Sequence, residues 1–127
     1  MAEKLAIQTD EAAVLGGPYP QAVIHHGLVY LSGQGAVDPR TNRVTLGTIE
    51  EETEMTLENI RIILEKCGSS MGKILQMTIY LLKMKEYGRF NEVYEQHFQG
   101  LLPARTCVQA AGLPFGLRVE IDAIAHL

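Results

Sequence analysis

Several features that point to familiar classes of protein are missing from this sequence of 127 residues. It has no tryptophan and only two cysteines, Cys67 and Cys107, which lie far apart and lack the Cys-x-x-Cys spacing of redox and zinc sites. Its longest nearly apolar stretch, residues 74–82, is far shorter than the about 20 residues that a membrane helix needs. We therefore expect reduced thiols and no membrane span, in a cytosolic or organelle-matrix protein.

Basic charge is also scarce. The sequence carries 11 Lys and Arg against 15 Asp and Glu, a formal net charge of −4 at pH 7. Because proteins that bind the phosphate backbone normally carry a basic patch, nucleic acid is not expected to be the main partner.

Motifs for cofactors and metals are missing as well. Gly33-Gln34-Gly35 lacks the third glycine of a dinucleotide site, and the sequence has no P-loop motif. The adjacent His25 and His26 would face opposite ways on a strand, so they make a poor metal chelate. We expect neither a cofactor nor a metal.

The residues that are present describe a folded globular protein. Hydrophobic residues make up 46% of the sequence and charged residues 20%, which is neither a disordered nor a fibrous composition. Domains commonly have about 100–150 residues, and a chain of this size buries roughly two thirds of its surface. Residues 1–127 are therefore expected to form a single domain.

Hydrophobic periodicity predicts two helices among short strands. Thr48 and Glu51 form a capping-box pattern before an apolar stripe of period 3.6, and Gly68 marks the end of this helix. Residues 85–98 predict a second helix with aromatic residues at helical spacing. Strands are predicted over residues 4–8, 22–25, 28–32, 74–82, 105–110 and 119–126. In residues 74–82, alternation places Leu75 on the same face as Met77.

This element order favours an α+β fold: a single, mostly six-stranded mixed sheet with two helices on one face. The last strand has an apolar face that includes Val119 and Ile121, while Glu120 and Asp122 point to the other side. The second face of the sheet would then be open and partly polar. Such a face usually packs against another copy of the chain, so we expect an oligomer.

Arg105 and Glu120 are the strongest candidates for chemistry. Arg105 lies in an apolar segment, where its planar guanidinium suits both oxygens of a small carboxylate. The alternative is an internal ion pair with Glu120 or Asp122. Glu120 can hold a water or act as a general base if burial raises its pKa, or it can be the solvated side of an edge strand. Sequence spacing leaves these alternatives open.

Over essentially its whole length the chain resembles the RidA/YjgF family of small trimeric proteins. The stretches that carry the resemblance are Gly17-Pro18-Tyr19-Pro20-Gln21-Ala22, Val29-Tyr30-Leu31-Ser32-Gly33-Gln34, Phe90-Asn91-Glu92-Val93-Tyr94, Pro103-Ala104-Arg105-Thr106-Cys107-Val108 and Val119-Glu120-Ile121-Asp122-Ala123-Ile124-Ala125. The resemblance implies a chorismate-mutase-like fold and a homotrimer with its sites between neighbouring subunits.

The resemblance also implies an activity. Active members of the family are cofactor-independent enamine/imine deaminases that limit metabolite damage. They hydrolyse 2-imino acids such as 2-iminobutanoate or 2-iminopropanoate to the 2-keto acid and ammonia. By resemblance, Arg105 binds the substrate carboxylate and Glu120 positions the water. The implied substrate-binding residues are Tyr19, Ser32, Gly33, Asn91 and Cys107.

The chain departs from the family pattern at Pro20, Gly35 and Phe115, which bears on the shape of the pocket and the side chain it prefers. Two other functions are alternatives. One is a regulatory module that binds a small carboxylate without turning it over. The other is an endoribonuclease or translation inhibitor, which the net charge of −4 disfavours.

Overall fold

The structure is a computed structural model that describes residues 3–14 and 16–127. Its strands are β1 (Leu5–Ile7), β2 (Ala22–His25), β3 (Leu28–Gln34), β4 (Val37–Asp38), β5 (Arg43–Val44), β6 (Ile74–Leu81), β7 (Ala104–Gln109) and β8 (Val119–His126). The two α-helices are α1 (Ile49–Lys66) and α2 (Tyr87–Gln96). Short 3-10 turns cover Met71–Lys73, Met84–Glu86 and Pro114–Gly116.

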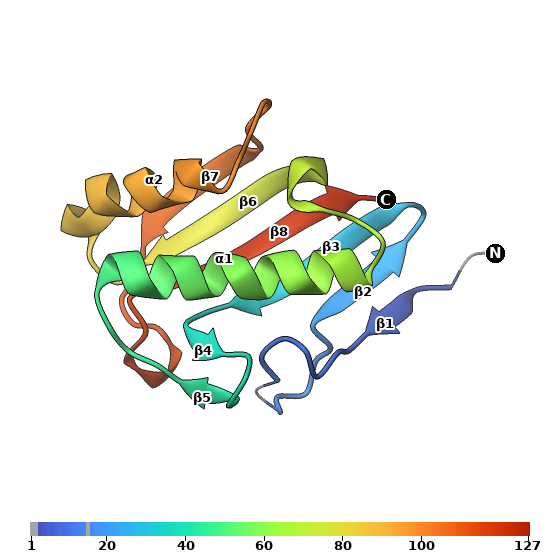
Figure 1. Cartoon of the computed structure of the whole chain (residues 1–127), viewed down its shortest axis with the longest axis horizontal. Helices are drawn as coiled ribbons and strands as arrows, with labels where there is room; N and C mark the ends of the chain where they lie inside the picture. The colour runs from blue at the N-terminus through green and yellow to red at the C-terminus, as the bar shows by residue number, and fades with distance from the viewer. Residues whose placement is uncertain (1–2, 15) are drawn as a thin grey trace.

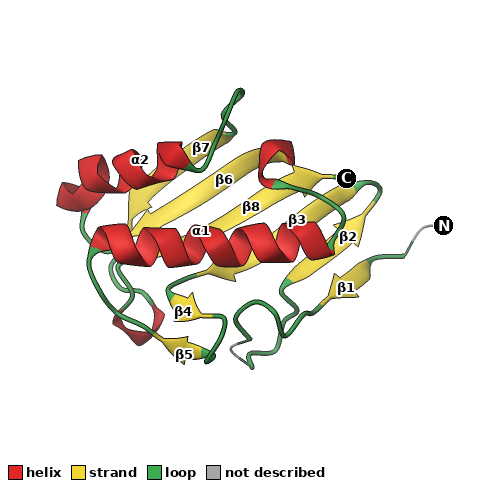
Figure 2. Ribbon diagram, viewed as in Figure 1, coloured by secondary structure: helices red, strands yellow, loops and turns green. Residues whose placement is uncertain are grey.

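Six strands form the main sheet in the order β1-β2-β3-β8-β6-β7, and β4 and β5 form a separate small ribbon. All neighbouring pairs are antiparallel except β6 and β7, which are parallel and joined through α2. Both helices lie on one face of the sheet, with α1 crossing its middle and α2 lying over β7 (Figures 1 and 2). The predicted six-stranded mixed sheet with two helices on one face is confirmed.

The start and end of α1 follow from its sequence. The Thr48 hydroxyl accepts a hydrogen bond from the Glu51 amide at 3.1 Å, and the Glu51 carboxylate accepts one from the Thr48 amide at 2.9 Å. Both bonds satisfy amides that the first turn of a helix leaves free. After the helix, Gly68 adopts a φ of 85°, which is favourable only for glycine. The predicted capping box is therefore present.

The core lies between α1, α2 and the sheet. On β8, Val119, Ile121, Ala123 and Ala125 are buried, as the alternating pattern predicted. On β6 the prediction fails at one residue: Leu75 is 48% exposed, while Ile74 is buried beside Met77. A register irregularity between Ile74 and Gln76 reverses the facing of this first part of the strand.

Two buried polar residues tie the loops to α1. The Asn59 side chain accepts a hydrogen bond from the Ala13 amide at 2.9 Å and donates one to the Val37 carbonyl at 2.7 Å. The Glu52 carboxylate accepts from the amides of Gly47 at 3.1 Å and Arg118 at 2.8 Å. These bonds fix the segments before β2 and β8, both of which lead to candidate site residues.

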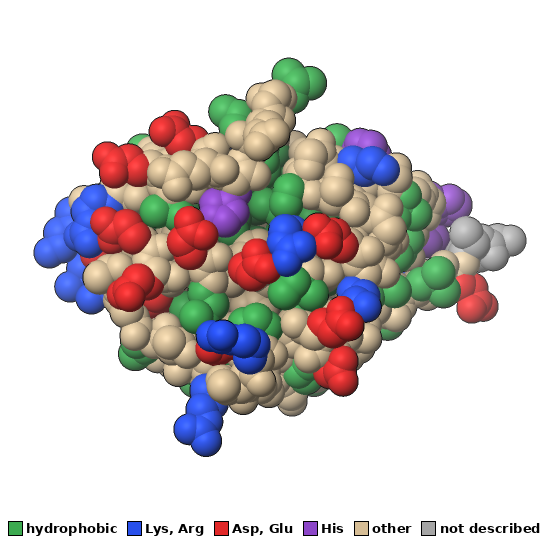
Figure 3. Space-filling model, in the orientation of Figure 1, with side chains coloured by type: hydrophobic (Ala, Val, Ile, Leu, Met, Phe, Trp, Pro, Cys, Tyr) green, Lys and Arg blue, Asp and Glu red, His purple; other side chains and the backbone are tan. Residues whose placement is uncertain are grey.

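On the helix side of the molecule, basic and acidic side chains are interspersed over α1 and its surroundings (Figure 3). Several form ion pairs, such as Arg61 with Glu58 and Glu65, and Arg89 with Glu50. Among the described residues, neither α-helix is long and apolar enough to span a bilayer.

Candidate active site

The candidate residues fall into two clusters on opposite faces of the sheet. Arg105 and Cys107 on β7 stand in register with the buried Met77 and Ile79 of β6, so their side chains point toward the helices. Glu120 lies between two residues of β8 that face the helices, and it therefore points to the open face. We call these the arginine cluster and the glutamate cluster.

The arginine cluster consists of Arg105, Cys107 and the α2 residues Tyr87, Asn91 and Tyr94. The guanidinium of Arg105 donates from Nη2 to Asn91 Oδ1 at 2.6 Å and to the Tyr87 hydroxyl oxygen at 3.0 Å. Its central carbon lies 4.7 Å from the centre of the Tyr94 ring and 5.5 Å from that of Tyr87. Tyr87, Asn91 and Tyr94 share one face of α2 because they are spaced by four and three residues.

Arg105 has no carboxylate within ion-pair distance in the described part of the chain, so the internal pair with Glu120 or Asp122 does not form. A positive charge held on aromatic rings without an acidic partner is suited to an anion from outside, because cation–π contacts and neutral acceptors leave its charge uncompensated. Arg105 lines a cavity of about 350 Å³ together with Asn91, Tyr94, Glu95, Leu102 and Pro103.

The charge of Arg105 also acts on its neighbours. The neighbouring Asn91 side chain and, after it, the hydrogen bond and charge of Arg105 lower the pKa of Tyr87. Burial raises the pKa of the Cys107 thiol, and the nearby Arg105 offsets part of that effect. Cys107 is therefore a protonated thiol at neutral pH and not an activated nucleophile.

The glutamate cluster lines an open cavity of about 360 Å³. Its lining residues are Tyr19, Ser32, Gly33, Gly35, Pro114, Phe115, Leu117 and Glu120. Burial, and secondarily the like charge of Asp122, raises the pKa of the Glu120 carboxyl above its ordinary value. A carboxylate with a raised pKa in a cavity can accept a proton near neutral pH, as a general base must.

Two glycines leave room for their neighbours in this cavity. A Cβ on Gly33 would lie 2.5 Å from Glu120 Oε2, so only glycine lets the carboxylate rest against β3. A Cβ on Gly35 would lie 2.6 Å from Cδ1 of Leu117, so Leu117 occupies the space that a side chain at this position would need. The departure from the family pattern at Gly35 is thus matched by the packing of Leu117.

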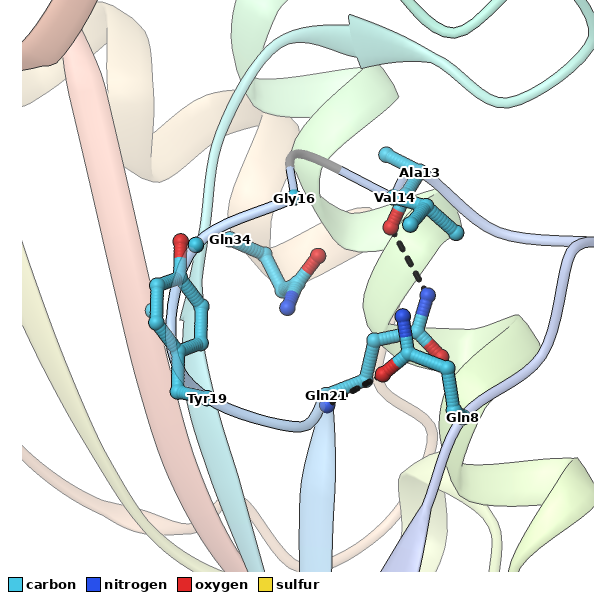
Figure 4. A pocket seen from close by; sticks show the side chains of 9 residues that line it. Gln8, Ala13, Val14, Gly16, Tyr19, Gln21 and Gln34 are labelled. Atoms are coloured by element: carbon cyan, nitrogen blue, oxygen red, sulfur yellow. Dashed lines mark hydrogen bonds between the residues drawn. The ribbon is translucent and has the colours of Figure 1, made fainter.

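Tyr19 and Ser32 are held by the loop that precedes β2. The Ser32 hydroxyl donates to the Pro20 carbonyl at 2.8 Å, and the buried Gln21 side chain donates to the Ala13 carbonyl at 2.7 Å. Figure 4 shows Tyr19 and Gln34 on one side of a small cavity of about 40 Å³, with Gln21 and Gln8 on the other. Tyr19 and Gly33 line both this cavity and the glutamate cluster.

The two clusters do not meet within one chain. Strand β6 separates β7 from β8, and Arg105 lies opposite Met77 whereas Glu120 lies opposite Tyr80. Two strand spacings and an offset of three residues place the two α-carbons about 14 Å apart. The side chains also leave opposite faces of the sheet. Each cluster therefore contains only some of the residues that the sequence predicts for the site.

Sequence reasoning missed several residues of both clusters. The helical spacing of the α2 aromatics does not by itself show that Tyr87 and the buried Tyr94 contact Arg105, although it puts both on one helix face with the candidate Asn91. Pro114 and Leu117 were not singled out, and nothing in their local pattern distinguishes them from ordinary turn and core residues.

Comparison with known proteins identifies the family of this chain. The sequence profile of the family described as Endoribonuclease L-PSP, which is the RidA/YjgF family, matches residues 9–127. The chain belongs to this family. It is 41% identical over 119 residues to the 2-iminobutanoate/2-iminopropanoate deaminase of Mus musculus, covering 94% of this chain and 88% of the relative. It is 37% identical over 123 residues to a RutC family protein of Pyrococcus horikoshii, covering 97% and 98%.

Solved structures of family members share the fold. RidA from an Antarctic Psychrobacter has a TM-score of 0.92 and 36% identity, over 97% of this chain and 99% of that chain. Escherichia coli TdcF, solved with bound serine, has a TM-score of 0.90 and 35% identity, over 97% and 98% of the two chains. The family of this chain therefore includes imine deaminases as well as proteins named only by family.

Proposed function

We propose that this protein is a cofactor-independent enamine/imine deaminase, which hydrolyses 2-imino acids such as 2-iminobutanoate or 2-iminopropanoate to 2-keto acids and ammonia. Two observations carry the proposal: Arg105 has no acidic partner among the described residues, and Glu120, which lines a cavity, has a raised pKa. The first suits a substrate carboxylate and the second suits an attacking water. The free thiols of Cys67 and Cys107 favour a cytosolic location.

The proposed catalytic unit is a homotrimer with sites between subunits. Since Arg105 and Glu120 leave opposite faces of one sheet, a site that uses both requires the arginine cluster of one subunit to face the glutamate cluster of the next. Identical chains form a closed ring when two different surfaces meet at each contact and the rotation between neighbours is a whole fraction of a full turn. Each subunit of the ring would then contribute one cluster to each of two sites.

In the proposed reaction, Arg105 binds the carboxylate of the imino acid and thereby holds the C=N carbon near Glu120. Ionised Glu120 takes a proton from a water as its oxygen bonds to that carbon, which gives a tetrahedral carbinolamine. Glu120 then gives this proton to the nitrogen and takes the hydroxyl proton of the carbinolamine as the C–N bond breaks, so that ammonia leaves and the C=O bond of the 2-keto acid forms. Proximity supplies much of the acceleration, and Glu120 acts chiefly in the transition state.

The name of one relative and the molecule bound in the structure of another support this assignment. The mouse relative is named a 2-iminobutanoate/2-iminopropanoate deaminase, and the structure of E. coli TdcF contains serine, an amino acid with a carboxylate. Tyr19, Ser32, Gly33, Asn91 and Cys107 are the proposed substrate-binding residues. They divide between the two clusters in the same way as Arg105 and Glu120.

The experiment is ammonia release in an assay in which a pyridoxal-phosphate dehydratase generates 2-iminobutanoate in situ. We expect the wild-type protein to accelerate release over buffer, and Arg105→Ala and Glu120→Gln each to abolish the acceleration. No acceleration by the wild-type protein, together with measurable binding of 2-oxobutanoate, would indicate a non-catalytic carboxylate-binding module. RNA cleavage that survives repurification and is lost in Glu120→Gln would indicate the ribonuclease alternative.

Mixing the two inactive variants tests the shared site directly. When Arg105→Ala and Glu120→Gln chains are co-expressed, random assembly puts an intact Arg105 opposite an intact Glu120 in about a quarter of the sites. Activity should therefore return to about a quarter of the wild-type value per site. A site formed within one chain would stay inactive, because neither chain carries both residues. Light scattering of the wild-type protein measures the oligomeric state.

A further inference from the structure

When an arginine guanidinium forms two hydrogen bonds with one carboxylate, Nη2 donates one of them. The side-on arrangement uses Nε and Nη2, and the end-on arrangement uses Nη1 and Nη2. The structure contains an example of the first: Arg89 donates to Glu50 from Nε at 2.9 Å and from Nη2 at 2.7 Å. An arginine that is to bind a substrate carboxylate in this way needs a hydrogen on Nη2 that is free.

Arg105 has no such hydrogen to spare. Both hydrogens of its Nη2 are taken, one by Asn91 Oδ1 at 2.6 Å and the other by the Tyr87 hydroxyl oxygen at 3.0 Å. A carboxylate that forms two bonds with Arg105 must therefore displace one of these acceptors. Tyr87 is the weaker one, because its bond is longer and its side chain stands at the first residue of α2 with 40% of its surface exposed.

The phenol oxygen occupies a place that suits a carboxylate oxygen. The phenol oxygen of Tyr87 accepts a hydrogen bond from Nη2 of Arg105 at 3.0 Å, so it acts there as an acceptor. A carboxylate oxygen is an acceptor too, and as an anion it forms stronger bonds with a guanidinium than a neutral hydroxyl does.

We propose that the Tyr87 hydroxyl is a placeholder for the substrate carboxylate: it occupies Nη2 of Arg105 in the free protein and leaves when a carboxylate oxygen takes its position. This inference rests on the proposed role of Arg105 in carboxylate binding. Tyr87 would hold the guanidinium ready in the resting state, and it would also weaken substrate binding, since its bond must be broken first. Asn91 would remain bound to Arg105 throughout.

The sign of the effect separates this role from a supporting one. Tyr87→Phe keeps the ring that lies 5.5 Å from the guanidinium and removes only the oxygen. A net hydrogen bond is worth about 0.5–1.5 kcal/mol, so the variant should bind 2-oxobutanoate about two- to tenfold more tightly than the wild type. The KM for the imine should fall by the same factor while kcat stays constant, because Tyr87 acts before the chemical step.

The measurement is an NMR or calorimetric titration of the intact protein with 2-oxobutanoate, followed by steady-state kinetics. Tyr30→Phe is the matched control, since within one chain Tyr30 lies on β3, three strands from β7 and on the opposite face of the sheet from Arg105. This control should bind as the wild type does. Arg105→Ala should lose binding.

The two hypotheses fail in different ways. If Arg105→Ala binds 2-oxobutanoate as tightly as the wild type, the proposed role of Arg105 is wrong and the placeholder hypothesis goes with it. If Arg105→Ala loses binding but Tyr87→Phe binds equally or more weakly than the wild type, the placeholder hypothesis is overturned and the proposed function stands. Equal tightening in Tyr30→Phe would also overturn it.

Discussion

The close contact between Gly33 and Glu120 allows the proposed general base to be moved without changing its chemistry. In Gly33→Ala, the new Cβ would lie 2.5 Å from Oε2, 3.0 Å from Cδ and 3.2 Å from Cγ of Glu120. Carbon and oxygen atoms that are not bonded rest at about 3.5 Å, so the carboxylate has to move by about 1 Å. The φ of Gly33 lies outside the left-handed region, so alanine fits its backbone.

A displacement of this size acts on turnover far more than on stability. Misplacing a reacting group by 1 Å can lower a rate by about 100-fold, and we expect kcat in the imine assay to fall about 10- to 100-fold. The KM should stay nearly constant if Arg105 on the other cluster provides most of the affinity. The melting temperature should change little, because the displaced atoms are the far end of a half-buried side chain.

Gly72→Ala is the matched control for this substitution. Gly72 lies in the 3-10 turn at Met71–Lys73, and a Cβ there would meet no atom within 4 Å. The control should therefore retain wild-type kcat. If Gly33→Ala also retained wild-type kcat, the position of the Glu120 carboxylate would not matter for the reaction, and the role proposed for it would be refuted.

Three further predictions concern pH and stability. Because the pKa of Glu120 is raised, activity should fall as the pH drops through that raised value. Asp122→Asn removes a like charge and should therefore move this loss of activity to lower pH. A pH–rate profile that is the same in Asp122→Asn as in the wild type would contradict this. Thr48→Ala should lower the free energy of unfolding by about 1 kcal/mol in urea titrations, with Thr48→Ser restoring it, since Glu51 loses its capping partner. Gly88→Ala should raise the free energy of unfolding by about 0.5–1 kcal/mol, because a Cβ on this α2 residue meets open space.

The parts of the fold that the sequence predicts are those with local causes. The capping box of Thr48 and Glu51 and the stop at Gly68 lie within or beside α1, so their signals are contained in a few neighbouring residues. The alternation of β8 is equally local. Its buried members can be identified from the chain alone because each strand residue faces away from the next.

Other features depend on partners far away in the chain. Leu75 follows the alternation of β6 in sequence, but a register irregularity against β8 turns it outward. Asn59 is polar and yet fully buried, because the groups that satisfy it are 46 and 22 residues away in the sequence. Hydrophobic periodicity does not include such distant partners, so it places Leu75 on the wrong face and does not predict the burial of Asn59.

The candidate site shows the same division. Arg105 and Glu120 can be singled out from the sequence, but their arrangement depends on the strand order. β7 and β8 follow each other along the chain, yet β6 lies between them in the sheet. Only this order reveals that Arg105 and Glu120 are separated and face opposite ways. Tyr87 is identified as a site residue by its hydrogen bond with Nη2 of Arg105, which no pattern in the sequence predicts.

The separation of the two clusters has a chemical consequence. If Arg105 and Glu120 were neighbours on one face of the same chain, they would form a resting ion pair that lowers the pKa of the carboxyl and occupies the guanidinium. On opposite faces, burial and Asp122 can raise the pKa of Glu120, while Arg105 is held by neutral acceptors alone. In the proposed assembly, Arg105 faces Glu120 of the next subunit across the site, and the substrate carboxylate that binds Arg105 compensates its charge. This leaves Glu120 free to accept the proton of the attacking water.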